Sequence, residues 1–69
     1  MQEFNKIKSV RVGAGITQNQ MADILGISRQ CYILKENGTK EFKLKEANVF
    51  VETVNKETGK YYTIKDIFF

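Results

Sequence analysis

The sequence predicts an all-α fold, a compact bundle of about five short helices with a central helix-turn-helix. Capping residues and glycines divide the chain into short segments, and apolar residues within these segments recur at helical spacing. A length of 69 residues is enough for one domain, so residues 1–69 are expected to fold as one unit around a modest core.

An amphipathic helix is expected first, over about residues 2–12, because Phe4, Ile7 and Val10 fall at helical spacing. Glycines bracket its end at residues 13–15. These residues form a GxG sequence, but no strand is expected before it and no third glycine follows. The GxG therefore indicates a helix stop and a turn rather than a nucleotide site.

A helix-turn-helix is expected in the stretch QNQMADILGISRQCYILKEN. Thr17 can cap its first helix, and Gln20 can complete a capping box. Gly26 can end that helix in a left-handed conformation at little cost. Ser28 can cap the second helix, which ends at residues 37–38. Two helices joined by so short a turn cross steeply, so the first turn of the second helix is expected to be exposed.

Another helix is expected after residues 39–43, which should form a short loop without a strong cap. Its apolar residues at helical spacing are Leu44, Ala47, Phe50, Val51 and Val54. The alternative is a β-hairpin in which residues 49–54 pair with residues 61–64. Strand alternation separates apolar from polar side chains poorly there, so the helix is favoured. Residues 55–60 are then expected to form a polar turn.

Thr63 and Asp66 predict a capping box for a last short helix. Its apolar face would contain Ile64, Ile67 and Phe68. No linker and no second domain is expected after it.

The composition argues against an enzyme. The chain has no histidine, and its single cysteine, Cys31, can form no internal disulfide and has no histidine to activate it. No catalytic residue, metal or cofactor is therefore expected. The chain is expected in the cytoplasm, because its start does not resemble a signal peptide and no apolar run approaches the ~20 residues of a membrane span.

Positive charge is concentrated in the middle of the chain. The net charge is +3, and residues 29–45 carry five basic and two acidic side chains. Residues 1–28 carry three basic and two acidic side chains, and residues 46–69 carry three basic and four acidic ones. A polyanion would therefore be attracted to the second helix of the helix-turn-helix and the loop after it. The alternative is an ordinary solvated lysine surface.

The segment ITQNQMADILGIS, followed by KENGTKEF, resembles the Cro/repressor-type (XRE) helix-turn-helix regulators of phages and bacteria. The resemblance covers about residues 4–68. It implies a lambda-repressor-like DNA-binding domain, and a Cro-like phage or prophage repressor in the bacterial nucleoid. Such a regulator binds an operator in double-stranded DNA, as a homodimer, with its second helix in the major groove.

The candidate DNA-binding residues are Gln18, Ser28, Arg29, Gln30, Leu34, Thr39 and Lys40. Arg29 and Gln30 occupy the first turn of the second helix, at positions that commonly touch bases in this family. Arginine can form two hydrogen bonds with guanine, and glutamine can form two with adenine. Leu34 can contact a thymine methyl group.

The other candidates are expected to contact the DNA backbone. Gln18 lies at the start of the first helix, where backbone N–H groups and the helix dipole can hold a phosphate. Ser28 can cap its helix and also contact the backbone, and Thr39 and Lys40 can clamp the next phosphate. Ordinary solvent exposure is the alternative for every candidate.

Some positions depart from the family pattern. Tyr32 and Lys35 occupy places where the family usually has aliphatic core residues. We expect Tyr32 to bury its ring with its hydroxyl on a polar partner, and Lys35 to bury only its stem. Ile33 and Leu34 stand where polar residues are common, so they could instead grip a protein partner. The second expectation is therefore an antirepressor-like module that binds a repressor.

Two further contacts are expected. Glu36 is expected to bond Arg11, as the matching residues of the family do, which would tie the first helix to the second helix of the helix-turn-helix. Homodimer contacts are expected from apolar residues of the C-terminal third, which are Phe50, Tyr61, Tyr62, Phe68 and Phe69.

Overall fold

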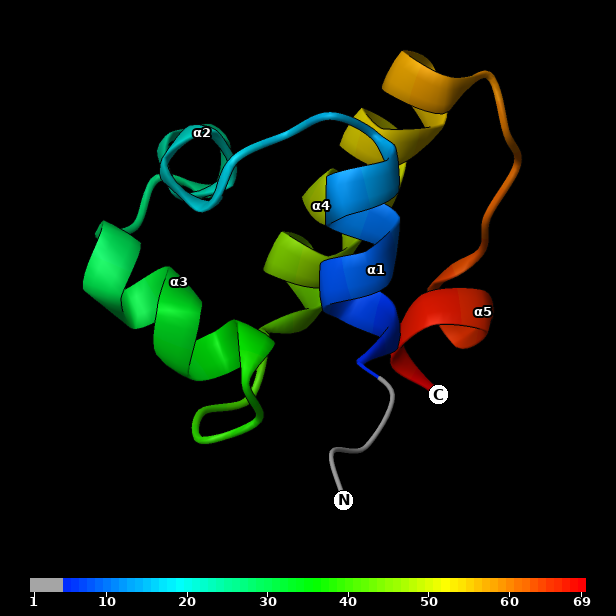
Figure 1. The fold of residues 1–69 in the computed structure, drawn as a ribbon. Coiled ribbons are helices and arrows are strands. Elements are labelled where there is room, and N and C mark those ends of the chain that lie inside the picture. Colours follow the sequence, from blue (N-terminus) through cyan, green and yellow to red (C-terminus); the bar gives the residue numbers. More distant parts are fainter. Residues whose placement is uncertain (1–4) are drawn as a thin grey trace.

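The computed structural model describes residues 5–69, which form five helices and no strand (Figure 1). The helices are α1 (Lys6–Gly13), α2 (Gln18–Leu25), α3 (Arg29–Glu36), α4 (Leu44–Thr58) and α5 (Ile64–Phe68). In Figure 1, α1 lies in front of α4, with α2 and α3 on one side and α5 on the other. The prediction of an all-α bundle is confirmed.

Helix α1 begins later than the sequence predicts. Asn5 is extended rather than helical, and its side-chain oxygen accepts a hydrogen bond from the Lys8 N–H at 3.0 Å. Its amide group also donates to the Glu36 carbonyl at 2.9 Å. These bonds make Asn5 the cap of the helix, so a helix through residue 5 is wrong. Residues 2–4 of the expected helix lie outside the described residues.

The helix-turn-helix has the predicted caps. Thr17 Oγ1 accepts from the Gln20 N–H at 3.0 Å, and Gln20 Oε1 accepts from the Thr17 N–H at 2.9 Å. Gly26 ends α2 with φ 73°, a conformation that favours glycine. Ser28 Oγ accepts from the Cys31 N–H at 3.0 Å and starts α3. Only residues 26–28 separate the two helices, as expected.

Helix α4 confirms the predicted helical periodicity, but it is longer than expected. The polar turn predicted at residues 55–60 is wrong for residues 55–58, which are helical, and Gly59 is the C-cap, with φ 73°. Asn55 explains the difference. Its side chain accepts from the Tyr62 N–H at 2.8 Å and donates to the Tyr62 carbonyl at 2.9 Å. This polar residue therefore holds the next loop while it remains helical.

Helix α5 begins at the predicted capping box. Thr63 Oγ1 accepts from the Asp66 N–H at 3.2 Å, and Asp66 Oδ2 accepts from the Thr63 N–H at 2.8 Å. The backbone N–H of Thr63 lowers the pKa of the Asp66 carboxyl. Ile67 is the buried residue of this helix.

The core is centred on α4 and reaches into α3. The fully buried large side chains are Tyr32, Phe50, Met21 and Val54. Tyr32 occupies a core position on α3, so the opposite face of that helix is directed away from the bundle. Since Phe50 is fully enclosed, the expectation that it lies on a dimer surface is wrong.

Candidate nucleic-acid interface

Helix α3 has one face in the core and one in solvent. Tyr32, Lys35 and Glu36 are buried, with 0, 7 and 5% of their surfaces exposed. Arg29 and Gln30, in the first turn, are both exposed. The two residues predicted to touch bases are therefore available to a partner, and the buried face fixes how the helix is turned.

The end of α3 is joined closely to the loop that follows. The Leu34 carbonyl accepts from the Thr39 N–H at 2.9 Å and from the Lys40 N–H at 3.0 Å. The side chains of Thr39 and Lys40 are exposed, whereas Leu34 and its neighbours Ile33 and Cys31 are half-buried. Because the backbone N–H groups are already bonded, any phosphate contact at this loop falls to the two side chains.

A hollow of about 560 Å³ lies where α1, the start of α2 and the start of α3 meet. It is lined by Lys8, Arg11, Thr17, Gln18, Asn19 and Arg29. Three of these residues are cationic, but Arg11 is buried and paired with Glu36, so Lys8 and Arg29 are the cations that can meet an anion, and the N-terminus of α2 adds a partial positive charge. A phosphate-sized anion would be attracted here. The structure thus brings the predicted Gln18 and Arg29 together.

Sequence reasoning did not select Lys8 or Asn19 as site residues. Lys8 is exposed on α1, which is distant in sequence from the helix-turn-helix. Its approach to Arg29 depends on how α1 packs, which local sequence does not state. Asn19 follows Gln18 directly, so its place in the first turn of α2 was a signal that could have been used.

Arg11 and Glu36 form the predicted contact between α1 and α3. Arg11 Nε donates to Glu36 Oε2 at 2.6 Å, and a second guanidinium nitrogen donates to Glu36 Oε1 at 3.1 Å. The third arm donates to the Ile16 carbonyl at 2.7 Å. The Arg11 and Glu36 side chains are only 7 and 4% exposed, so this is a buried, two-armed ion pair.

Glu36 also accepts from Gln18 Nε2 at 3.3 Å, which connects the ion pair to the start of α2. Burial tends to raise the pKa of the Glu36 carboxyl, but the hydrogen bonds from Arg11 and Gln18 contribute to a net lowering. The hydrogen bond to Glu36 raises the pKa of Arg11. Gln18 is therefore oriented by the protein itself, with its side-chain amide directed to Glu36.

Lys35 departs from its prediction. Its ammonium is buried rather than only its stem, and Nζ donates to Glu46 Oε1 at 2.5 Å. Glu46 also accepts from the Lys43 N–H at 2.9 Å, which supports the start of α4. Burial tends to raise the pKa of Glu46, and the hydrogen bonds from Lys35 and Lys43 bring it below its usual value. This second buried ion pair joins α3 to α4.

Tyr32 buries its ring as expected, and its hydroxyl lies near the Glu36 and Arg11 side chains, but the expected hydrogen bond to a polar partner is not formed. Within residues 5–69, the buried hydroxyl oxygen has no hydrogen-bond partner. Burial raises the pKa of this hydroxyl, and the nearby Glu36 carboxylate raises it further. The ring packs edge-to-face on Phe42, with centroids 6.1 Å apart.

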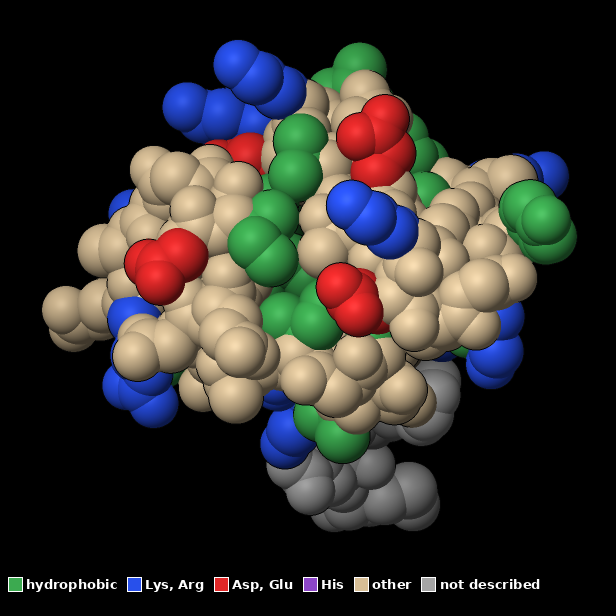
Figure 2. Space-filling view, turned by 90° about the horizontal axis from the view of Figure 1, so that it is seen from above, with side chains coloured by type: hydrophobic (Ala, Val, Ile, Leu, Met, Phe, Trp, Pro, Cys, Tyr) green, Lys and Arg blue, Asp and Glu red, His purple; other side chains and the backbone are tan. Residues whose placement is uncertain are grey.

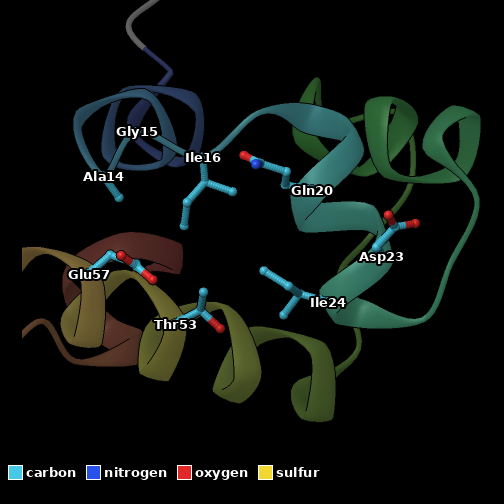
Figure 3. Close-up of a pocket in the computed structure, with 8 residues that line it drawn as sticks. All are labelled: Ala14, Gly15, Ile16, Gln20, Asp23, Ile24, Thr53 and Glu57. Atoms are coloured by element: carbon cyan, nitrogen blue, oxygen red, sulfur yellow. The ribbon is translucent and has the colours of Figure 1, made fainter.

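A second hollow lies between α2 and α4, on the face seen in Figure 2. Figure 2 shows hydrophobic side chains along a furrow, with acidic side chains on both sides. Figure 3 shows Ile16 and Ile24 pointing into it, with Asp23 and Glu57 at its edges. None of the candidate DNA-binding residues lines this hollow. Its acidic edges make it unsuitable for nucleic acid.

Other classes of site can be compared with the described chain. No group of three or more histidine, cysteine, aspartate and glutamate residues within residues 5–69 is arranged to hold a metal ion. In the same residues, no helix has both the length and the apolar character that crossing a bilayer requires.

Comparisons with family models, with curated proteins and with solved structures give no match for this chain. The resemblance to Cro-type regulators therefore rests on the residues quoted above and on the helix-turn-helix that they form.

Proposed function

We propose that this chain is a sequence-specific regulator of transcription that binds double-stranded DNA, of the kind found in Cro-like phage and prophage repressors. The observation that carries the proposal is the outward face of α3, where exposed Arg29 and Gln30 lie next to the cationic hollow at the start of α2. A reading helix beside a phosphate-binding helix start is how a helix-turn-helix recognises DNA.

In this mechanism α3 enters the major groove. Gln30 bonds an adenine with two hydrogen bonds, and the partly exposed Leu34 lies near a thymine methyl group. Arg29 lines the hollow as well as the reading face, so it is within reach of either a guanine edge or a phosphate. The two roles predict different effects of the same substitution.

The backbone contacts come from both ends of the reading helix. At its start, Lys8 and the first turn of α2, with Gln18, hold one phosphate. Ser28 caps α3 and is exposed beside them. At its end, the side chains of Thr39 and Lys40 hold another. A dimer placed in this way on a near-palindrome in the bacterial nucleoid would block a promoter.

Selection of bound sites from random DNA duplexes tests the proposal. The expected result is an enriched near-palindrome with half-sites about one DNA turn (~34 Å) apart. Binding should weaken steeply with salt, because each neutralised phosphate contributes a slope of about −0.9 in log K against log salt concentration. No enrichment, together with binding that salt does not affect, would contradict the proposal.

Arg29→Ala then separates the two roles of Arg29, with Lys56→Ala on the exposed end of α4 as the matched control. If Arg29 reads guanine, binding weakens by about 5- to 150-fold and selectivity relaxes at one base pair. If it contacts a phosphate, binding weakens on all sequences and the salt slope falls by about 1. Lys56→Ala should change neither the affinity for DNA nor the salt slope.

The second candidate is an antirepressor-like module that binds a repressor. Ile33 and Leu34 favour it, because both are apolar and only half-buried on the outward side of α3. An apolar protein interface responds little to salt, unlike phosphate contacts. Site selection without enrichment would favour this candidate.

A further inference from the structure

Gln18 connects the buried Arg11–Glu36 ion pair with the hollow at the start of α2. Its side chain is half-buried and lines the hollow, and its Nε2 donates to Glu36 Oε1 at 3.3 Å. Glu36 does not line the hollow itself. Glu36 can therefore influence a phosphate in the hollow in two ways, through its charge or through Gln18.

The charge of Glu36 is balanced within the ion pair. Arg11 donates to both oxygens of the carboxylate, at 2.6 and 3.1 Å, and the Arg11 and Glu36 side chains are 7 and 4% exposed. Two opposite charges in such close contact nearly cancel at a distance. The pair therefore adds little net charge to the hollow, and Gln18 is the remaining connection between Glu36 and a ligand there.

The contact with Glu36 fixes which end of the Gln18 amide faces the ion pair. An ionised carboxylate only accepts hydrogen bonds, so the amide nitrogen must face it and the amide oxygen must not. That nitrogen carries two hydrogens, and Glu36 takes one, so the other is left for an acceptor in the hollow. The Gln20 N–H at the same helix start is already bonded to Thr17 Oγ1 at 3.0 Å. The side chain of Gln18 is thus a valuable donor at this position.

Holding Gln18 in advance would strengthen binding. A free glutamine side chain has several rotatable bonds and loses considerable entropy when a ligand immobilises it. A side chain that the protein already holds in the donating orientation avoids this cost on binding. The buried ion pair holds Glu36 in place, so Glu36 can act as a fixed anchor for the amide.

We propose that Glu36 is a positioning residue for DNA binding, which holds the Gln18 amide as a donor to a backbone phosphate. The proposal rests on the proposed function. It adds a second role to the structural one, because the ion pair could join α1 to α3 without any contact with Gln18.

Two matched variants test this role on the duplex that site selection recovers. Both carry Arg11→Met, so that neither keeps a buried charge without its counter-charge. Glu36→Gln in this background keeps an amide oxygen that can accept from Gln18, whereas Glu36→Leu removes the acceptor. The Glu36→Leu variant should bind about 2- to 12-fold more weakly than the Glu36→Gln variant, which is the cost of immobilising one side chain. Urea unfolding confirms that both variants are folded under the conditions of the assay.

Gln18→Ala shows whether the difference passes through Gln18. In the wild type it should weaken binding by about tenfold, because a hydrogen bond to a charged group is lost. When Gln18→Ala is added to both matched variants, they should bind DNA equally. Lys40→Ala, at the other end of α3, should leave the difference between the matched variants intact. The salt slope should be the same for both matched variants, because they carry the same number of cations.

NMR relaxation of side-chain amides tests the orientation of Gln18 without DNA. The Gln18 amide should be restrained in the wild type and in the variant with Glu36→Gln. In the variant with Glu36→Leu it should be as mobile as the amide of Asn19, which is the next residue and is exposed.

Several results would overturn the proposal. These are equal affinities of the two matched variants, a difference between them that persists after Gln18→Ala, or a wild-type Gln18 amide as mobile as that of Asn19. A wild-type chain that does not bind duplex DNA rejects the proposed function and this role with it. A chain that binds DNA, but whose matched variants bind equally well, rejects only the positioning role.

Discussion

The Arg11–Glu36 ion pair should contribute a large part of the stability of this chain. Arg11→Met removes the guanidinium but keeps most of the buried stem, so packing changes little. The substitution leaves the Glu36 carboxylate and the Ile16 carbonyl without their main hydrogen-bond donors. In the wild type, the Arg11 and Glu36 side chains are only 7 and 4% exposed. Removing one partner of a buried pair costs about 3–5 kcal/mol.

The remaining bond from Gln18 to Glu36, at 3.3 Å, should keep the loss near the lower limit. We therefore expect Arg11→Met to lower the free energy of unfolding by about 3 kcal/mol. A chain of this size has a total of roughly 3–10 kcal/mol. The melting temperature should fall by about 12–24 °C, at 4–8 °C for each kcal/mol.

Thermal and urea unfolding followed by circular dichroism at pH 7 measure the loss. The matched variant, Arg11→Met with Glu36→Leu, removes both charges and should recover most of the stability. A loss below about 1 kcal/mol in the single variant, or a double variant no more stable than the single one, would refute this account of the pair.

Three other predictions concern the buried polar groups. Lys35→Met should lower the free energy of unfolding by about 2–3 kcal/mol. This is less than for a fully enclosed pair, because Glu46 keeps some exposure and its bond to the Lys43 N–H. The double variant, Lys35→Met with Glu46→Leu, should have a free energy of unfolding within about 1 kcal/mol of the wild-type value. Tyr32→Phe should leave the free energy of unfolding in urea unchanged or raise it by up to about 1 kcal/mol, because the hydroxyl has no hydrogen-bond partner within residues 5–69. A clear loss of stability would show that the Tyr32 hydroxyl does form a hydrogen bond. The melting temperature should fall as pH drops below 4.5, because Glu36 and Glu46 have lowered pKa values and stabilise the fold only while ionised. The melting temperature of the double variant, Arg11→Met with Glu36→Leu, should fall less over the same pH range. An equal fall would contradict the role of Glu36 in this pH dependence.

The parts of the fold that sequence predicts well are those decided within a few residues. Thr17 with Gln20 and Thr63 with Asp66 form capping boxes because the bonded groups are three residues apart. Gly26 ends α2 for an equally local reason. The exposure of Arg29 and Gln30 follows from the same caps.

The parts that sequence reasoning missed depend on tertiary packing. Asn55 reads as a turn residue, but its two bonds to the Tyr62 backbone allow it to stay helical. The hollow beside Arg29 needs Lys8, which only the packing of α1 brings there. Lys35 and Glu46 are 11 residues apart on different helices, so their pairing required the angle between α3 and α4.

The Lys35–Glu46 pair also constrains how this sequence can change over generations. A sequence that loses either Lys35 or Glu46 keeps a buried charge without its counter-charge until the other residue is also replaced. Aliphatic residues at both positions avoid this cost. Descendants of this chain should therefore keep both residues or exchange both together. Among relatives that share its ancestry, positions 35 and 46 should covary more tightly than neighbouring surface positions.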